Sequence, residues 1–305
     1  MTERPARVLI APVSFGLGDL VISLPVVQAV VRKGASSGRE TWLVTRSDVQ
    51  ESLSERIGGL AGTVAERDVV VGPDDVLIDL RDHPLQRDAW WGSPEFEAAH
   101  GSLSINEILH RIVGDFGVEA DFSRPIPLAS RARTDVEELV LLVADSDGAA
   151  KRWPPARWTE LSHRLGRQGM EIAVVTRSAC DGPLADWGLT GLVASTVGDA
   201  VDVLTGCRAV IGVDTGLTHI AAQQGTPTVT LCRMPATYFR AWDHTRLVAG
   251  TWCDPECRQM EREYAYHQRV DLTVPPLVPR SCPVQASCLR SIEPDHVMSA
   301  LFDLL

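Results

Sequence analysis

Residues 209–232 have the sequence AVIGVDTGLTHIAAQQGTPTVTLC and contain a complete strand–helix–strand unit. The runs 209–213 and 228–232 are short, apolar and rich in β-branched residues, as buried strands are. The stretch 216–225 between them has the length and composition of a helix. Two strands joined through a helix pair in parallel, so this stretch predicts an α/β fold with a parallel sheet.

The same alternation continues upstream in two series. The chain has 305 residues, and at ~100–200 residues per domain this length fits two domains. We therefore expect two Rossmann-like α/β domains. The second series, which ends in the unit above, has strands at 138–144 and 171–176 and helices at 155–168 and 197–207. The first series has strands at 7–13, 41–45, 68–72 and 75–80. Its helices lie after residue 19, near 48–57 and at 104–117.

The stretch 121–134 has no periodicity and is the expected linker between the two series. We predict an N-terminal domain over residues 1–128 and a C-terminal domain over 129–290. A terminal amphipathic helix follows at 291–305, with Pro294 in its first turn.

Composition excludes several classes of protein. A net charge of −11 and a pI near 5.2 argue against nucleic-acid binding, which needs clustered Lys and Arg. No apolar run approaches the ~20 residues of a membrane span, and no signal-peptide cleavage pattern follows the first arginines. We expect a cytoplasmic protein without stable membrane insertion.

Cysteine usage does not predict a disulfide framework, since the chain has seven cysteines. A zinc site and packed, reduced thiols both remain open for the last four, whose spacing is looser than is usual for structural zinc. These are Cys253, Cys257, Cys282 and Cys288.

The turn at 213–219 (VDTGLTH) lies at the expected carboxyl edge of a parallel sheet, where open α/β proteins bind ligands. The amides near 215–217 begin a helix and favour an anionic group such as a diphosphate. Asp214 and His219 lie beside them. The structural alternative is that Asp214 and Thr215 only cap the helix and His219 belongs to the core.

The turn at 14–19 (SFGLGD) also joins a strand to a helix. Gly16 and Gly18 allow the backbone to turn sharply and approach a ligand. Val21 occupies the third position of a dinucleotide fingerprint, so an NAD oxidoreductase is a distant alternative. Asp19 has two interpretations: it caps the helix, or it accepts the proton of an attacking hydroxyl as a general base.

Lys151 follows the strand at 138–144, and the only other lysine is Lys33. A lysine at the carboxyl end of a sheet can contact leaving-group phosphate as a mobile point charge. The alternative is a solvated surface charge. Asp145 and Asp147 form a D-x-D pattern, a weak match to a metal–diphosphate signature, and whether they bind a metal remains open.

Together these segments resemble the ADP-heptose:lipopolysaccharide heptosyltransferase family. The resemblance implies the GT-B fold, with two Rossmann-like domains facing a central cleft and a C-terminal helix crossing back to the N-terminal domain. The matching residues are 18–21 (GDLV) with Leu24 and Pro25, 151–154 (KRWP) with Trp158, 213–219 with Ala221, 225–228 (GTPT), and a tail of Cys288, Leu289, Ile292, Glu293, Pro294 and Val297.

The resemblance also implies roles. Asp19 takes the place of the general base, and Lys151 the place that contacts donor phosphate and sugar. Such enzymes invert the anomeric centre in one displacement and need no metal or cofactor. The predicted donor-binding residues are Ser146, Lys151, Asp214, Thr215, Gly216, Leu217 and His219, in a domain that takes a nucleotide diphosphate sugar, ADP-heptose first.

For the acceptor we predict a small natural-product scaffold. Residues 1–140 hold 14 Lys and Arg against 22 Asp and Glu, a net of −8 that suits a neutral or cationic molecule. Trp90 and Trp91 lie in a long loop and could stack on a planar or sugar face. The predicted acceptor-binding residues are Gly16, Gly18, Trp90, Trp91 and His100.

Three alternatives remain. The acceptor is a lipopolysaccharide or another cell-surface saccharide, the chain is a nucleotide-sugar epimerase on the same two-domain fold, or it is a non-catalytic nucleotide-sugar-binding protein. We expect a monomer.

Overall fold

A computed structural model describes residues 5–87, 98–100, 103–146, 151–177, 189–232, 242–250 and 287–305. These residues form two compact units, with the division between Ile126 and Pro127. The boundary predicted after residue 128 lies close to this division.

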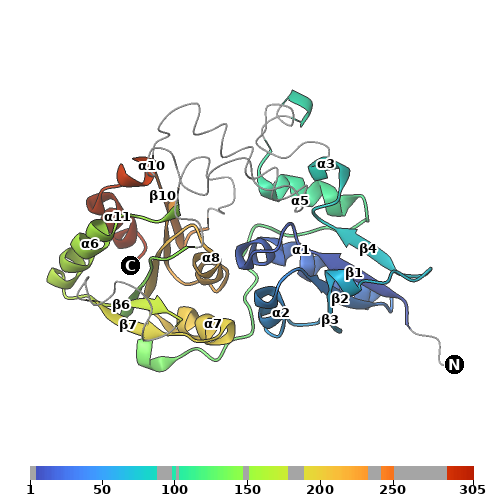
Figure 1. Ribbon diagram of the computed structural model, residues 1–305, viewed down its shortest axis with the longest axis horizontal. Helices are drawn as coiled ribbons and strands as arrows, with labels where there is room; N and C mark the ends of the chain where they lie inside the picture. The colour runs from blue at the N-terminus through green and yellow to red at the C-terminus, as the bar shows by residue number, and fades with distance from the viewer. Residues whose placement is uncertain are drawn as a thin grey trace. The chain divides into compact units, whose positions relative to one another are not determined.

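The first unit is built on a four-stranded sheet in the order β3-β2-β1-β4, in which all strand pairs are parallel (Figure 1). Its strands are β1 (Arg7–Ala11), β2 (Glu40–Thr45), β3 (Gly62–Ala65) and β4 (Val76–Asp79). The central strand β1 is buried along its whole length. Its residues 8–11 are apolar on both faces, as parallel strands covered on both sides require, and Arg7 at its start pairs with Asp75.

The longest helix of the first unit, α1, packs against β1 and β2. Pro25 lies well inside it and is buried together with Leu20, Leu24 and Val27. Helix α5 begins with a capping box, in which Ser104 and Glu107 exchange hydrogen bonds. The helices here are α1 (Leu17–Ser36), α2 (Asp48–Ser54), α3 (Pro84–Arg87), α5 (Ile105–Gly114) and the 3₁₀ turn η1 (Glu66–Asp68).

The second unit has a six-stranded sheet in the order β10-β9-β8-β5-β6-β7, again with parallel pairs throughout. The chain runs outward from β5 to β7 on one side and from β8 to β10 on the other. Its strands are β5 (Leu139–Val143), β6 (Glu171–Thr176), β7 (Thr190–Val193), β8 (Ala209–Val213), β9 (Thr228–Cys232) and β10 (Thr245–Ala249).

Helices cover both faces of this second sheet (Figure 1). On one face α6 and α11 pack together, and on the other α7 packs beside α8. This three-layer arrangement confirms the predicted α/β class with parallel sheets. The helices are α6 (Pro155–Arg167), α7 (Val197–Gly206), α8 (Gly216–Gln223), α10 (Ser287–Arg290), α11 (Pro294–Phe302) and the 3₁₀ turn η2 (Thr134–Val136).

The packing of the terminal helix on the N-terminal domain stays a prediction. Helix α11 belongs to the second unit, where it contacts α6, β9 and β10. Val297 and Leu301 are fully buried in the core that Trp153, Trp158 and the strands form. The apolar face of the helix is therefore satisfied within this unit.

One expectation is wrong in the first unit. The apolar run 68–72 is not a strand: Val70 and Val71 are largely exposed, in the connection from β3 to β4. Arg7 donates a hydrogen bond from Nη2 to the Val70 carbonyl at 2.8 Å, so a side chain satisfies this backbone group in place of a sheet ladder. Strand β3 lies just upstream.

In the described part of the chain, no helix is long and apolar enough to span a membrane.

Candidate functional site

The second sheet has its topological switch point between the neighbouring strands β5 and β8. The chain leaves these strands in opposite directions across the sheet, so the loops after them separate and leave room for a ligand. Lys151 lies beyond the end of β5, and Asp214 directly follows β8. The sheet order therefore brings together two residues that the sequence predicted for one donor site.

Lys151, Asp214 and His219 form one connected group. The Lys151 ammonium lies 2.9 Å from Asp214 Oδ2, and His219 Nε2 lies 3.3 Å from Asp214 Oδ1. The Lys151 side chain is 37% exposed, whereas that of His219 is only 10% exposed. The lysine thus faces solvent at the mouth of the group, and the histidine lies at its base.

Two opposing effects act on the Asp214 carboxylate. Desolvation by burial raises its pKa, but the Lys151 charge and the hydrogen bond from His219 together outweigh that effect and hold the pKa of Asp214 well below its ordinary value. Asp214 is therefore a fixed anion at neutral pH. It neutralises the lysine while leaving part of that side chain open to solvent.

The start of α8 is held against β8 by a side chain of its own. Thr218 Oγ1 donates to the Val213 carbonyl at 2.7 Å, and a Cβ at Gly212 would come within 2.2 Å of the same hydroxyl. In the part of the chain that the structure describes, the Thr215 side chain makes no capping hydrogen bond. The first amides of α8, including those of Gly216 and Leu217, thus lack this side-chain acceptor.

Ser146 and its neighbours lie on the β5 side of the switch point. Ser146 is buried, and its carbonyl accepts a hydrogen bond from Arg152 Nε at 2.9 Å. The same nitrogen pairs with Asp145 Oδ1 at 2.9 Å, so the Asp145 charge is partly neutralised. Asp147 lies outside the described residues, and the D-x-D hypothesis stays untested.

Asp19 lies at the start of α1 in the first unit, at the edge of the sheet where β1 ends. Its Oδ2 accepts a hydrogen bond from the Gly16 amide at 3.0 Å, so the carboxylate caps the helix from its third position. Among the described contacts its Oδ1 accepts none. A Cβ at Gly16 would come within 2.8 Å of Asp19 Oδ2, which explains the glycine.

The predicted acceptor residues are placed unevenly. Gly18 lies in the first turn of α1 next to Asp19, while His100 is exposed in the short described stretch 98–100. Trp90 and Trp91 lie outside the described residues, as do Cys253, Cys257 and Cys282. No group of three metal-binding side chains occurs among the residues that the structure describes.

Sequence reasoning missed the residues that hold the turn before Asp19. Gln50 is fully buried and donates from Nε2 to the carbonyls of Ser14 at 2.8 Å and Gly16 at 3.0 Å. The Arg46 side chain is 1% exposed and reaches the Pro12 carbonyl. The signal available was an arginine directly after an apolar strand and a glutamine in the first turn of the helix that follows.

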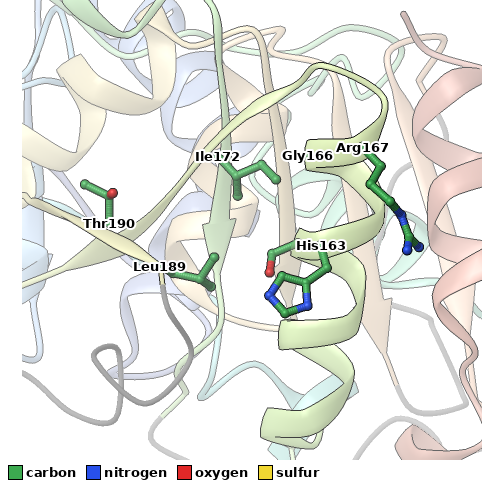
Figure 2. Close-up of a pocket in the computed structure, with 7 residues that line it drawn as sticks. His163, Gly166, Arg167, Ile172, Leu189 and Thr190 are labelled. Atoms are coloured by element: carbon green, nitrogen blue, oxygen red, sulfur yellow. The ribbon is translucent and has the colours of Figure 1, made fainter.

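An open pocket lies elsewhere on the second unit. Figure 2 shows His163 and Arg167 from α6 beside Ile172, Leu189 and Thr190. Ile172 is near the start of β6 and Thr190 is the first residue of β7. The pocket therefore borders the amino ends of the strands, opposite the edge that carries Lys151 and Asp214, and it is no part of their group.

Comparison with known proteins places this geometry in context. Residues 118–267 match the model of glycosyltransferase family 9 (heptosyltransferase). Lipopolysaccharide heptosyltransferase 1 of Pseudomonas aeruginosa is 36% identical over 149 residues, which cover 46% of this chain and 40% of that protein. The match thus spans less than half of that relative's length.

Two solved structures resemble the whole chain. The E. coli heptosyltransferase WaaC with ADP has a TM-score of 0.64 and 15% identity, covering 98% of this chain and 100% of that one. A family 9 glycosyltransferase from Veillonella parvula has a TM-score of 0.66 and 13% identity, covering 98% and 97%. At such identities the likeness shows the fold, and that fold is GT-B.

Proposed function

This chain belongs, through residues 118–267, to glycosyltransferase family 9, the heptosyltransferases, and on that premise we propose that it moves a sugar from a nucleotide diphosphate sugar to an acceptor hydroxyl or amine. ADP-heptose is the first candidate for the donor. Most of the family match lies in the second unit, and it includes Lys151, Asp214 and His219. The donor half of the reaction is accordingly the better supported half.

The observation that carries the proposal is the group at the switch point of the second sheet. A diphosphate needs a cation that can move toward it and amides that already point at it. Lys151 is partly exposed and held 2.9 Å from Asp214, and the start of α8 lacks a Thr215 side-chain cap. These groups supply both requirements within one unit.

The Lys151–Asp214 pair also suggests how the donor enters. A phosphate oxygen that reaches the ammonium gains a charge-assisted hydrogen bond. It displaces less bound water than it would at a fully exposed lysine. Asp214 keeps its contact with His219 at 3.3 Å when the ammonium turns away from it. The anion behind the lysine thereby orients the cation before the donor arrives.

The proposed chemistry is a single displacement at the anomeric carbon. The acceptor oxygen or nitrogen forms a bond to C1 while the bond from C1 to the diphosphate oxygen breaks, and the acceptor proton passes to Asp19. The electron pair leaves with the diphosphate, whose charge Lys151 and the α8 amides stabilise. Such a displacement inverts the anomeric centre, and no metal is assigned a part in it.

Asp19 has one carboxylate oxygen for each of two tasks. Oδ2 accepts the Gly16 amide and fixes the side chain, and Oδ1, which has no partner among the described contacts, is the oxygen that would take the proton. Capping and general-base catalysis are therefore compatible in this residue. A carboxylate fixed by one bond loses less entropy when it reacts.

For the acceptor we favour a small, neutral or cationic natural-product scaffold. The net charge of −8 over residues 1–140 repels phosphorylated saccharides and attracts cations. A lipopolysaccharide saccharide is the second candidate, favoured by the 36% identity to lipopolysaccharide heptosyltransferase 1. A cytoplasmic location and a monomeric state remain part of this proposal.

The purified full chain can test the donor first. Its unfolding temperature is measured with ADP, UDP, GDP and ADP-heptose, because a ligand at 100 times its Kd adds ~2.7 kcal/mol of stability. We expect ADP and ADP-heptose to give the largest shifts. No shift with any nucleotide would contradict the donor assignment.

Turnover is then measured as ADP release from ADP-heptose with amine- and hydroxyl-bearing small molecules and with a lipopolysaccharide core fragment. ADP release that depends on an acceptor supports transfer. Conversion of the sugar without any acceptor would identify an epimerase instead. Binding of donor without ADP release under every condition would identify a non-catalytic nucleotide-sugar-binding protein.

A further inference from the structure

One buried side chain in the first unit contacts the other three strands of its sheet at or just beyond their carboxyl ends. Arg46 is the first residue after β2, and its side chain is 1% exposed. Its guanidinium donates to the Pro12 carbonyl after β1, to Glu66 Oε1 after β3 at 2.8 Å, and to Asp79 at the end of β4 at 2.7 and 2.9 Å.

The charges around Arg46 balance. Asp79 and Glu66 are the two carboxylates, and Arg81 adds a second guanidinium that donates to Glu66 Oε1 at 2.7 Å. Asp79 Oδ1 also accepts the Arg81 and Asp82 amides at 2.9 and 3.0 Å. A buried charge needs such partners, and a planar guanidinium meets several fixed acceptors at once, which an ammonium does not.

A second chain of contacts runs from the main chain of Arg46 to the proposed base. The Arg46 amide donates to Gln50 Oε1 at 2.9 Å, and Gln50 Nε2 donates to the carbonyls of Ser14 and Gly16. The Gly16 amide in turn donates to Asp19 Oδ2. Arg46 therefore holds both the beginning of the turn, at Pro12, and its end.

Side chains from the segment after β2 hold the turn over 12–16 through hydrogen bonds to its carbonyls. Glycine at position 16 has no Cβ to restrict the backbone, and its replacement would collide with Asp19. The conformation that presents Asp19 must be imposed by neighbours. The neighbours that contact the turn from β2 and its following helix are Arg46, Gln50 and Ser47, whose hydroxyl donates to the Phe15 carbonyl at 2.6 Å.

We propose that Arg46, acting through Gln50, is a positioning residue for the Asp19 carboxylate. The inference rests on the proposed function, since it assumes that Asp19 is the general base. Arg46 itself has no assigned contact with either substrate. Its effect on the reaction is to fix the turn over 12–16, and displacements of about 1 Å in reacting groups can cost ~10²-fold in rate.

The structure offers a matched control for the loss of a buried arginine. Arg7 lies at the opposite, amino end of β1, and its side chain is 8% exposed. Its guanidinium pairs with Asp75 at 2.7 Å and reaches the Val70 carbonyl. Arg7→Lys removes a similar ionic contact from the same sheet. It does so away from the turn that carries Asp19.

The test compares Arg46→Lys, Gln50→Met and Arg7→Lys in the full chain. The assay is ADP release from ADP-heptose with whichever acceptor gives turnover, or with water as acceptor where none does. We expect Arg46→Lys and Gln50→Met to lower kcat by about 10- to 100-fold with the ADP affinity unchanged within twofold. Arg7→Lys should keep kcat within twofold of the wild-type value, even if its unfolding temperature falls as much as that of Arg46→Lys.

A readout independent of activity follows the Gly16 amide. With ¹⁵N-glycine labelling, hydrogen exchange at Gly16 should accelerate in Arg46→Lys and Gln50→Met and stay unchanged in Arg7→Lys. Gln50→Met leaves the ion pairs of Arg46 intact but removes the hydrogen bonds from Gln50 to the turn. It therefore still tests the inference if Arg46→Lys does not fold. Unchanged exchange at Gly16 in both variants would overturn the inference.

A double variant separates positioning from general destabilisation. If Arg46 acts through Asp19, Arg46→Lys should not lower the residual rate of Asp19→Asn further, whereas a purely structural effect would lower both backgrounds equally and overturn the inference. Normal turnover in Asp19→Asn would refute the proposed base and this inference with it. Lost turnover in Asp19→Asn with normal turnover in both positioning variants would overturn this inference alone.

Discussion

Lys151 and Asp214 form an ion pair 2.9 Å long between the segments that follow the adjacent strands β5 and β8. The sheet order makes these residues neighbours although more than sixty positions separate them in the chain. His219 joins the pair one helical turn further on. A group assembled from separate segments at a switch point is a feature of ligand sites in open α/β sheets.

Replacing the lysine should weaken donor binding. Lys151→Met removes a charge-assisted contact to phosphate, worth ~1.5–3 kcal/mol, so we expect the Kd for ADP to rise about 10- to 100-fold in isothermal titration calorimetry. Lys33→Met is the matched control, because Lys33 is the other lysine and its ammonium contacts the Gly117 carbonyl at 2.5 Å. An unchanged Kd in Lys151→Met would exclude the lysine from the donor site.

Asp214→Asn should change how stability depends on pH. The folded pKa of Asp214 lies well below its unfolded value of about 3.9, because Lys151 and His219 stabilise the anion. Its contribution is therefore complete above pH ~4 and is lost as pH falls further. The variant should unfold at a lower temperature than the wild type at pH 7, and this difference should shrink at pH 3. A difference that is constant with pH would contradict the ion pair.

Asp19→Asn should lower turnover without releasing the donor. The amide keeps an oxygen for the Gly16 bond but cannot take a proton, so we expect kcat to fall by at least ~10²-fold with the Kd for ADP unchanged. Asp199→Asn is the control, since Asp199 caps α7 in the same manner through the Thr196 amide at 3.1 Å. If kcat fell equally in both variants, Asp19 would act only as a helix cap.

Cys207 should resist alkylation in the native protein. Burial raises the pKa of its thiol to about 12, so at pH 8 the thiolate fraction is on the order of 10⁻⁴. Peptide mapping after iodoacetamide treatment should find Cys207 unmodified in the folded chain and modified after denaturation. Rapid native labelling at this position would show that the α7–β8 connection opens readily.

Leu301→Ala should destabilise the second unit. Leu301 is fully buried in α11 beside Trp153 and Trp158, and truncating a buried leucine typically costs ~2–5 kcal/mol. Denaturant unfolding monitored by tryptophan fluorescence measures the loss. Phe302→Ala is the control, because Phe302 is 44% exposed and should change stability by less than ~1 kcal/mol.

The sequence predicted the elements with the strongest patterns. Strands β5, β6, β8 and β9 are apolar runs that need both faces covered, and the turns after β1 and β8 could be placed because glycines and a polar group follow such runs. Edge strands β7 and β10 escaped notice, since their residues are partly exposed and carry no such pattern.

Long-range contacts were harder to predict than local ones. Nothing in the periodicity of α11 reveals which sheet it covers, because an amphipathic helix only requires some apolar partner. Likewise, Arg46 could not be assigned to Asp79 from spacing. An ion pair depends on which strands are neighbours, and that order is a property of the whole sheet.

The Trp153 indole donates to the Ile292 carbonyl at 3.2 Å, and Leu289, Val297 and Leu301 complete the hydrophobic core around it. A ribosome that has synthesised residues 127–250 has made every described strand of this sheet, yet the nascent chain still lacks that part of its core. The hydrophobic core of this unit can therefore be completed only after about fifty more residues have been synthesised. Messages truncated in this interval should yield products that proteases remove quickly.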